Sequence, residues 1–297
     1  MKTPDAYVET VGPIDRPVRE VLIFFATTYA FTWGFFLAAK QLNPGPRTVM
    51  ILVGAFGPSL VAVVLTARRG GRTQVKALLS RLLLWRVKLR WYAFALGFMA
   101  AVKLTVAVIY RVSHGRWPHF GAHSLGTIVV LIVLAGIIGG PLGEEIGWRG
   151  YALPRLAQRL GLAPASLVLG LVWSLWHLPL FVLSVGGDQF GQSFPTYLLQ
   201  VTALSVAMAW LMAGTDGSVL LAVLFHSAIN QSKDIVPSGV LGPDRAWALS
   251  TSSTAWLTVG VLWVAAAYFL SCMPWHGQPR RGSSHGISGA ARRASQA

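Results

Sequence analysis

The sequence of 297 residues is poor in cysteine and in charge. Cys272 is the only cysteine, so no disulfide bond can form within the chain. Charged residues make up 12% of the chain and hydrophobic residues 54%, whereas charged residues account for about a quarter of an ordinary soluble domain. So few charges cannot cover a surface that faces water. This composition excludes the ordinary soluble enzymes and favours a protein whose solvent is lipid.

Acidic residues are also scarce, with 10 Asp and Glu against 25 Lys and Arg, which gives a net charge of +15. Such an excess of positive charge would suggest nucleic acid in a soluble protein. Here the basic residues flank long apolar segments, as the positive-inside rule describes for membrane proteins. We therefore expect no nucleic-acid partner.

The apolar segments predict an all-α, polytopic membrane bundle of about eight transmembrane helices in a single domain, residues 1–297. Roughly 20 apolar residues span the hydrocarbon core as a helix. The expected spans are Val21–Leu42, Val49–Ala67, Trp91–Tyr110, Leu125–Leu142, Ala163–Ser184, Thr196–Met212, Ser218–Ile235 and Ser252–Cys272.

Counting Lys and Arg in the connections gives the orientation. With the N-terminus inside, eighteen lie in the inner segments and five in the outer ones. This asymmetry predicts both termini on the cytoplasmic side of the cell membrane. No internal repeat is evident, which argues against a transporter built from paired halves.

The most basic connection, Arg68–Arg90, contains no acidic residue. Its pattern predicts a basic amphipathic helix that lies on the anionic inner leaflet. Residues 276–297, rich in Gly, Ser and Arg, are predicted to be disordered.

An ionisable residue inside a membrane span is costly and suggests a functional site. Glu144 and Glu145 end the fourth span, and their side chains point in different directions on a helix. Arg149 lies four residues after Glu145 and is its expected ion-pair partner, which leaves Glu144 free. Taken alone, the cluster is also compatible with an acidic pair balanced by an arginine at the membrane interface.

Two further polar pairs lie on later spans. Trp173 and His177 share one face of the fifth span, and His226 and Asn230 share one face of the seventh. Each pair alone is compatible with a structural role, as a buried histidine near a proline or as a hydrogen bond between helices. Together with Glu144, they supply a base, hydrogen-bond donors and an acid for amide hydrolysis.

At these residues the sequence resembles the CPBP family of intramembrane proteases, which includes the type II CaaX prenyl endopeptidases and bacteriocin-processing, immunity and lysostaphin-resistance-like relatives. The family pattern is Glu-Glu-x-x-x-Arg, then Phe-x-x-x-His, then His-x-x-x-Asn. The chain matches it over residues 125–235, with Trp173 in the place of the Phe.

The resemblance implies a peptidase in which Glu144, helped by His177, activates water while His226 and Asn230 stabilise the oxyanion. Glu145, Arg149 and Trp173 would be supporting residues. Family members are often called metalloproteases, and His177, His226 and Glu144 could ligate zinc. We favour a metal-free site, because zinc would occupy the only free carboxylate.

One structural question and two alternative functions remain from the sequence. Glu144 reaches the depth of the two histidines if the fourth helix continues past Arg149 or if the fifth helix starts within the membrane interface. We expect the former, with 151–160 closing the cytoplasmic end. A transporter or channel with a His/Glu proton relay is one alternative, and a catalytically idle immunity or assembly factor is the other. The substrate, a CaaX-like peptide, a leader peptide or another membrane protein, cannot be identified from the sequence.

Overall fold

A computed structural model describes residues 17–121, 140–183, 193–232 and 252–276, with short pieces at 126–127, 130–132, 134, 235–237 and 247. All regular structure within these residues is helical, which confirms the predicted all-α class. The helices are α2 (Pro17–Ala39), α3 (Pro44–Ala55), α4 (Gly57–Ser80), η1 (Arg81–Leu83), α5 (Leu89–His114), α7 (Gly140–Glu145), η2 (Ile146–Ala152), α8 (Leu153–Leu160), α9 (Leu162–Trp176), α10 (Leu178–Val182), α12 (Phe194–Gly214), α13 (Val219–Ser232) and α14 (Ser253–Ser271).

Among the residues that the structure describes, six helical segments are long and apolar enough to cross a membrane, and Val219–Ser232 is a shorter apolar helix. Seven of the eight predicted spans overlap these helices. Most of the predicted span Leu125–Leu142, and all of the predicted disordered tail after His276, fall outside the described residues. The count of eight and the cytoplasmic placement of both termini therefore stay predictions.

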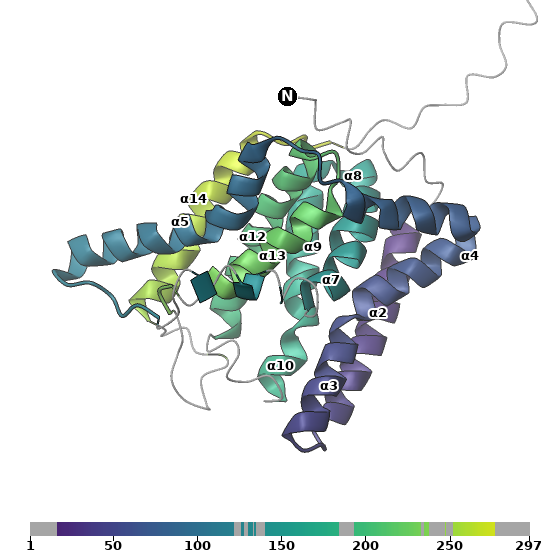
Figure 1. The fold of residues 1–297 in the computed structure, drawn as a ribbon, viewed down its shortest axis with the longest axis horizontal. Coiled ribbons are helices and arrows are strands. Elements are labelled where there is room, and N and C mark those ends of the chain that lie inside the picture. The colour runs from purple at the N-terminus through teal and green to yellow at the C-terminus, as the bar shows by residue number, and fades with distance from the viewer. Residues whose placement is uncertain are drawn as a thin grey trace, which may run out of the picture.

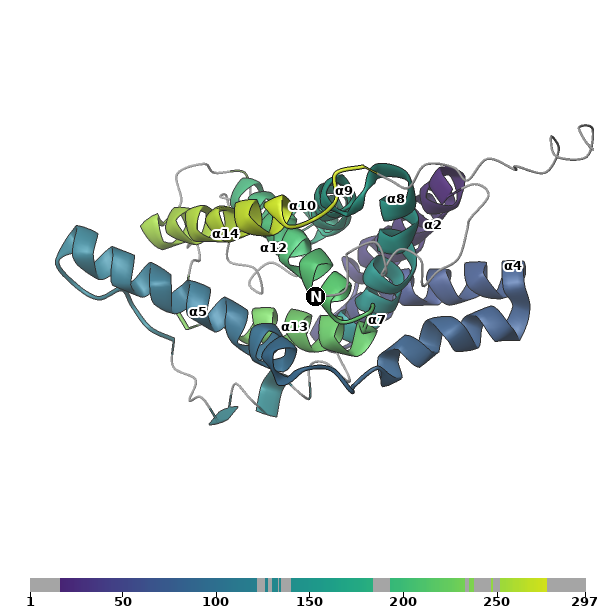
Figure 2. The same ribbon diagram turned by 90° about the horizontal axis from the view of Figure 1, so that it is seen from above.

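The bundle has an inner group of helices between two outer groups. Figures 1 and 2 show α2, α3 and α4 at one end of the long axis and α5 with α14 at the other, with α9, α12 and α13 between them. The main core cluster is built largely from the inner helices, where α12 packs on α9, α13 and α14.

The segment that carries the two glutamates is one uninterrupted helical run, because α7, η2 and α8 follow each other without a break from residue 140 to 160. The predicted continuation past Arg149 is confirmed. Its middle part, η2, is a π-helix, in which the Leu153 N–H donates to the Trp148 carbonyl oxygen five residues earlier. Short π-helical stretches occur often at functional sites.

Two glycines bring this run against the start of α4. A Cβ at Gly143 would lie 2.9 Å from the Ala55 carbonyl oxygen, and a Cβ at Gly147 would lie 2.5 Å from the Pro58 carbonyl carbon. Glycines four residues apart let two helix backbones approach closely. The glutamates therefore sit on a helix whose position is fixed by contact between backbones.

The basic connection differs from its prediction. Helix α4 extends to Ser80 but turns sharply at Gly71, whose φ of 59° favours glycine (Figure 2). Helical structure then ends at Leu83, so residues 68–90 are not one amphipathic helix. Arg81 in this segment points into the protein, where Nη1 donates to the Gly150 carbonyl and Nε to the Gly217 carbonyl.

An ion-pair cluster joins the outer helix α2 to the rest of the bundle. Glu20 in α2 is paired with Arg69 of α4, and its Oε2 accepts a hydrogen bond from Arg155 Nε of α8 at 3.1 Å. Arg155 also donates to the Tyr151 carbonyl oxygen. The cluster ties α2 and α4 to the same helical run that carries Glu144.

Candidate active site

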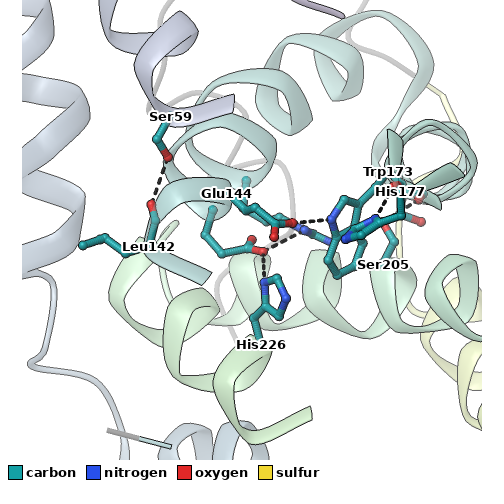
Figure 3. A network of polar contacts seen from close by, with 10 residues as sticks. Ser59, Leu142, Glu144, Trp173, His177, Ser205 and His226 are labelled. Carbon is teal, nitrogen blue, oxygen red and sulfur yellow. Dashed lines mark hydrogen bonds and ion pairs between the residues drawn. The ribbon is translucent and has the colours of Figure 1, made fainter. Parts of the chain in front are cut away.

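Glu144 is held on one side by a tryptophan from another helix. The Trp173 indole Nε1–H of α9 donates to Glu144 Oε2 at 2.6 Å, and only 4% of the Glu144 surface is exposed (Figure 3). No other hydrogen bond to this carboxylate is found among the described residues. One carboxylate oxygen is therefore fixed, and the other is available for chemistry.

Glu145 joins two residues from opposite sides. Its Oε1 accepts from Arg149 Nη1 at 3.0 Å, which confirms the predicted ion pair, and it also contacts His226 Nδ1 at 2.7 Å. All three residues are buried. Since a carboxylate oxygen only accepts hydrogen bonds, His226 carries its proton on Nδ1, and its Nε2 is directed elsewhere.

His177 lies at the junction between α9 and α10. Helix α9 ends at Trp176, one residue before His177, and the following helix carries Pro179 in its first turn. The His177 Nδ1 lies 2.9 Å from the Trp173 carbonyl oxygen, so Nδ1 bears the proton and Nε2 is the acceptor nitrogen of the ring. The predicted site histidine is thus buried, and its tautomer is set by a backbone carbonyl.

Aromatic rings fill the space between these groups. The Trp173 ring lies 5.1 Å from the His226 ring and 6.0 Å from the His177 ring, measured between centroids. The Tyr197 ring of α12 contacts His177 at 5.4 Å, and Tyr197 interacts electrostatically with Glu144. Glu144, His177 and His226 therefore surround a single tryptophan, whereas Asn230 is less closely tied to them.

Asn230 lies one helical turn after His226 on α13 and is half-buried. Within the described residues no hydrogen bond to its side chain is found. Its place on the face of His226 agrees with the spacing in the sequence, but the structure shows no contact that joins it to Glu144 or His177.

The sequence offers His177, His226 and Glu144 as possible ligands for a zinc ion. In the part of the chain that the structure describes, no group of three His, Cys, Asp or Glu side chains is arranged to hold a metal ion. The Nδ1 atoms of both histidines are engaged, by a carbonyl and by Glu145, an arrangement also found in histidines that bind zinc through Nε2. Because the described side chains do not come together as a three-ligand group, we derive no step through a metal.

Three features of this site were missed at the level of sequence. Motif spacing indicated neither the bond from Trp173 to Glu144 nor that from His226 to Glu145, because both join helices far apart in the chain. Tyr197 carries no motif at all. An aromatic residue with a polar edge at position 173 was the one available signal, since a buried indole N–H usually finds an acceptor.

The chain was compared with known proteins. A family model described as "Type II CAAX prenyl endopeptidase Rce1-like" matches residues 125–232. CAAX prenyl protease 2 of Methanococcus maripaludis is 25% identical over 259 residues, which cover 82% of this chain and 91% of that protein. The segment matched by the family model contains every site residue from Glu144 to Asn230.

Proposed function

On the premise that the chain belongs to the CPBP family of membrane-embedded peptidases, as both matches indicate, we propose that it is an endopeptidase in which Glu144 activates water. The observation that carries this proposal is the bonding of the Glu144 carboxylate. Glu144 keeps one carboxylate oxygen without a hydrogen bond from the described residues, and since Nδ1 of His177 and of His226 is engaged, we assign Nε2 of each ring to the reaction.

Glu144 is the group best suited to act as general base. It is buried, it is held through Oε2, and its Oε1 has room beside Gly140, which has no side chain. A base must lie within hydrogen-bond reach of the water that it activates. His177, with Nδ1 protonated, offers Nε2 as a second acceptor that orients the same water.

His226 and Asn230 are proposed to stabilise the oxyanion. His226 donates Nδ1–H to Glu145, so it can donate from Nε2 only when the ring carries two protons. Glu145 lies behind this ring as a carboxylate lies behind the histidine of a Ser-His-Asp triad, where it orients the imidazole. The Asn230 amide would supply a second donor from the next turn of the helix.

The reaction follows from these roles. Glu144 takes a proton from water, and the oxygen adds to the carbonyl carbon of the scissile bond, which places a negative charge on the carbonyl oxygen. The intermediate then collapses, the C–N bond breaks, and the proton held by Glu144 passes to the leaving nitrogen. The products are a carboxylic acid, which then releases its proton to become a carboxylate, and a free amine.

The proposed substrate is a peptide at the membrane surface or within another membrane protein. The relative's name supports a CaaX-like C-terminal peptide, and a leader peptide is the other class that we propose. The exposed basic residues Arg68, Arg72, Lys76, Arg86 and Lys88 are proposed to face an anionic inner leaflet of the cell membrane, with both termini in the cytoplasm.

Cleavage of a peptide library in proteoliposomes tests the proposal. Glu144→Gln keeps the shape of the side chain but removes the base, so we expect activity to fall by roughly 10² or more at unchanged expression. Leu104→Ala, on a lipid-exposed face of α5, is the matched control and should keep its activity. Full activity in a folded Glu144→Gln protein would rule out the assigned base.

A further inference from the structure

Trp173 contacts each ionisable residue of the site except Glu145. Its indole N–H donates to Glu144, its carbonyl oxygen accepts from His177, and its ring lies under the Arg149 guanidinium and beside the His226 ring. A side chain that only filled space would not need its N–H to meet a carboxylate and its ring face to meet a guanidinium.

The two oxygens of Glu144 lie in different surroundings. Oε2 accepts the indole N–H at 2.6 Å, whereas Oε1 lies on the side of Gly140, where an added Cβ would come within 2.9 Å of it. A short hydrogen bond from a fixed indole removes the freedom of the carboxylate to rotate and exchange its oxygens. Oε1 is therefore the oxygen left to receive a proton.

The link to His177 depends on where α9 ends. The His177 backbone N–H donates to the Ser174 carbonyl, so it does not occupy the Trp173 carbonyl oxygen as it would in a continuing α-helix. The last carbonyls of a helix need other donors. The His177 ring supplies one through Nδ1–H, which fixes the tautomer of the ring.

The ring of Trp173 is itself held from the other side. The Arg149 Cζ lies 4.1 Å from the ring centroid, a cation–π contact in a buried site, and Arg149 is anchored by Glu145. The indole plane is thereby fixed relative to α7, which carries Glu144. This gives the N–H a defined direction.

We propose that Trp173 is a positioning residue whose indole N–H determines which oxygen of Glu144 acts as the base. This inference rests on the proposed function, in which Glu144 is the base. It assigns a role to the indole N–H in particular, which phenylalanine, the residue of the resembled motif, would not have.

Trp173→Phe tests the role of the N–H, because it keeps an aromatic ring and the backbone carbonyl. We expect kcat to fall by about tenfold or more, the usual effect of losing a hydrogen bond to a charged group, with KM changed by less than about twofold. Trp148→Phe is the matched control, since Trp148 is fully buried in the next helical segment and its indole N–H has no partner among the described residues. An unchanged kcat in Trp173→Phe would overturn the inference.

A spectroscopic measurement separates positioning from packing. In ¹⁵N-labelled tryptophan spectra, we expect the indole proton of Trp173, assigned by its loss in Trp173→Phe, to be shifted downfield and to move in Glu144→Gln. Gly140→Ala provides a second variant, because its Cβ displaces Oε1, and it should move the same signal and lower kcat. A Trp173 signal that neither variant moves would also overturn the inference.

The two proposals can fail separately. If Glu144→Gln is inactive while Trp173→Phe retains wild-type kcat, the positioning role is wrong and the proposed base stands. If Glu144→Gln is active, the proposed function is wrong, and the positioning role fails with it because it requires Glu144 to be the base.

Discussion

The outer and inner helices of this protein are both apolar, but they differ in how much of their surface is buried within the protein. In α5, 33% of the most apolar stretch is buried within the protein, against 72% in α12, although the mean hydropathy of the α5 stretch is the higher of the two, 1.9 against 1.5. The ionisable residues proposed for catalysis all lie on inner segments, from α7 to α13. Mean hydropathy therefore identifies the helices that can cross a membrane, whereas buried ionisable residues identify the candidate active site.

Both regions also contain a buried glutamate that pairs with arginine. Glu20 of the outer helix α2 holds Arg69 and Arg155, and Glu145 of the inner helix α7 holds Arg149 and His226. The partners differ in one respect, since only Glu145 touches a site residue. Similar ion pairs thus hold helices together in the outer region and position a site residue in the inner region.

The largest expected effect comes from removing these charges. Glu145→Gln leaves the fully buried Arg149 without its counter-charge, which should cost about 3–5 kcal/mol of stability, and it also weakens the orientation of His226, so that specific activity falls. Glu20→Gln should cost less, because the Arg69 side chain is 46% exposed, and should leave specific activity unchanged. Thermal unfolding in detergent and activity per folded molecule measure the two effects.

Equal specific activity in folded Glu145→Gln and Glu20→Gln would contradict the difference between the two regions. The sequence alone suggested that Glu145 acts mainly through stability, because only Arg149 was foreseen as its partner. The contact with His226 adds the expected loss of activity.

A smaller effect on stability is expected from replacing a leucine by alanine in one inner and one outer helix. Leu211→Ala in α12 removes a side chain that is completely buried and should lower stability by about 2–5 kcal/mol. Leu104→Ala in α5 removes one that is 53% exposed and should lower it by less than about 0.5 kcal/mol. Chemical or thermal denaturation in the same detergent measures both, and similar losses would mean that α5 is buried by a partner.

No effect is expected from removing metal. Purified protein treated with a strong chelator should keep its activity, because the carboxylate proposed as base would otherwise be committed to the ion. Elemental analysis should find less than stoichiometric zinc. Loss of activity on chelation, with recovery on adding zinc, would replace the metal-free mechanism and leave the peptidase assignment intact.

Local spacing was enough to predict part of this site. The Glu145–Arg149 pair follows from a separation of four residues on one helix, and the continuation of the helix past Arg149 follows from the depth that Glu144 must reach. The bonds from Trp173 to Glu144 and from His226 to Glu145 could not be predicted. They depend on the rotation of α9 and α13 relative to α7, which tertiary packing sets.

The turn in α4 was missed for a different reason. The pair Gly70-Gly71 is a recognised signal for a break in a helix, but the basic and apolar pattern around it was interpreted as one amphipathic helix. The inward direction of Arg81 has no local signal, because its acceptors are carbonyls at Gly150 and Gly217 on later segments.

The π-helix η2 makes the spacing between the glutamates and α8 sensitive to chain length. Residues before and after it are related by a wider turn than in an α-helix, as if one residue had been inserted. If residues 146–152 took up ordinary α-helical geometry with no residue deleted, α7 would rotate by about 100° relative to α8, whereas deleting one residue at the same time would roughly restore the phase. After such a rotation Glu144 could not face Trp173 while Arg155 still faced Glu20. This stretch thus sets the phase between the proposed catalytic centre and the Glu20 ion-pair cluster on α2, and its wider turn matters as much as its side chains.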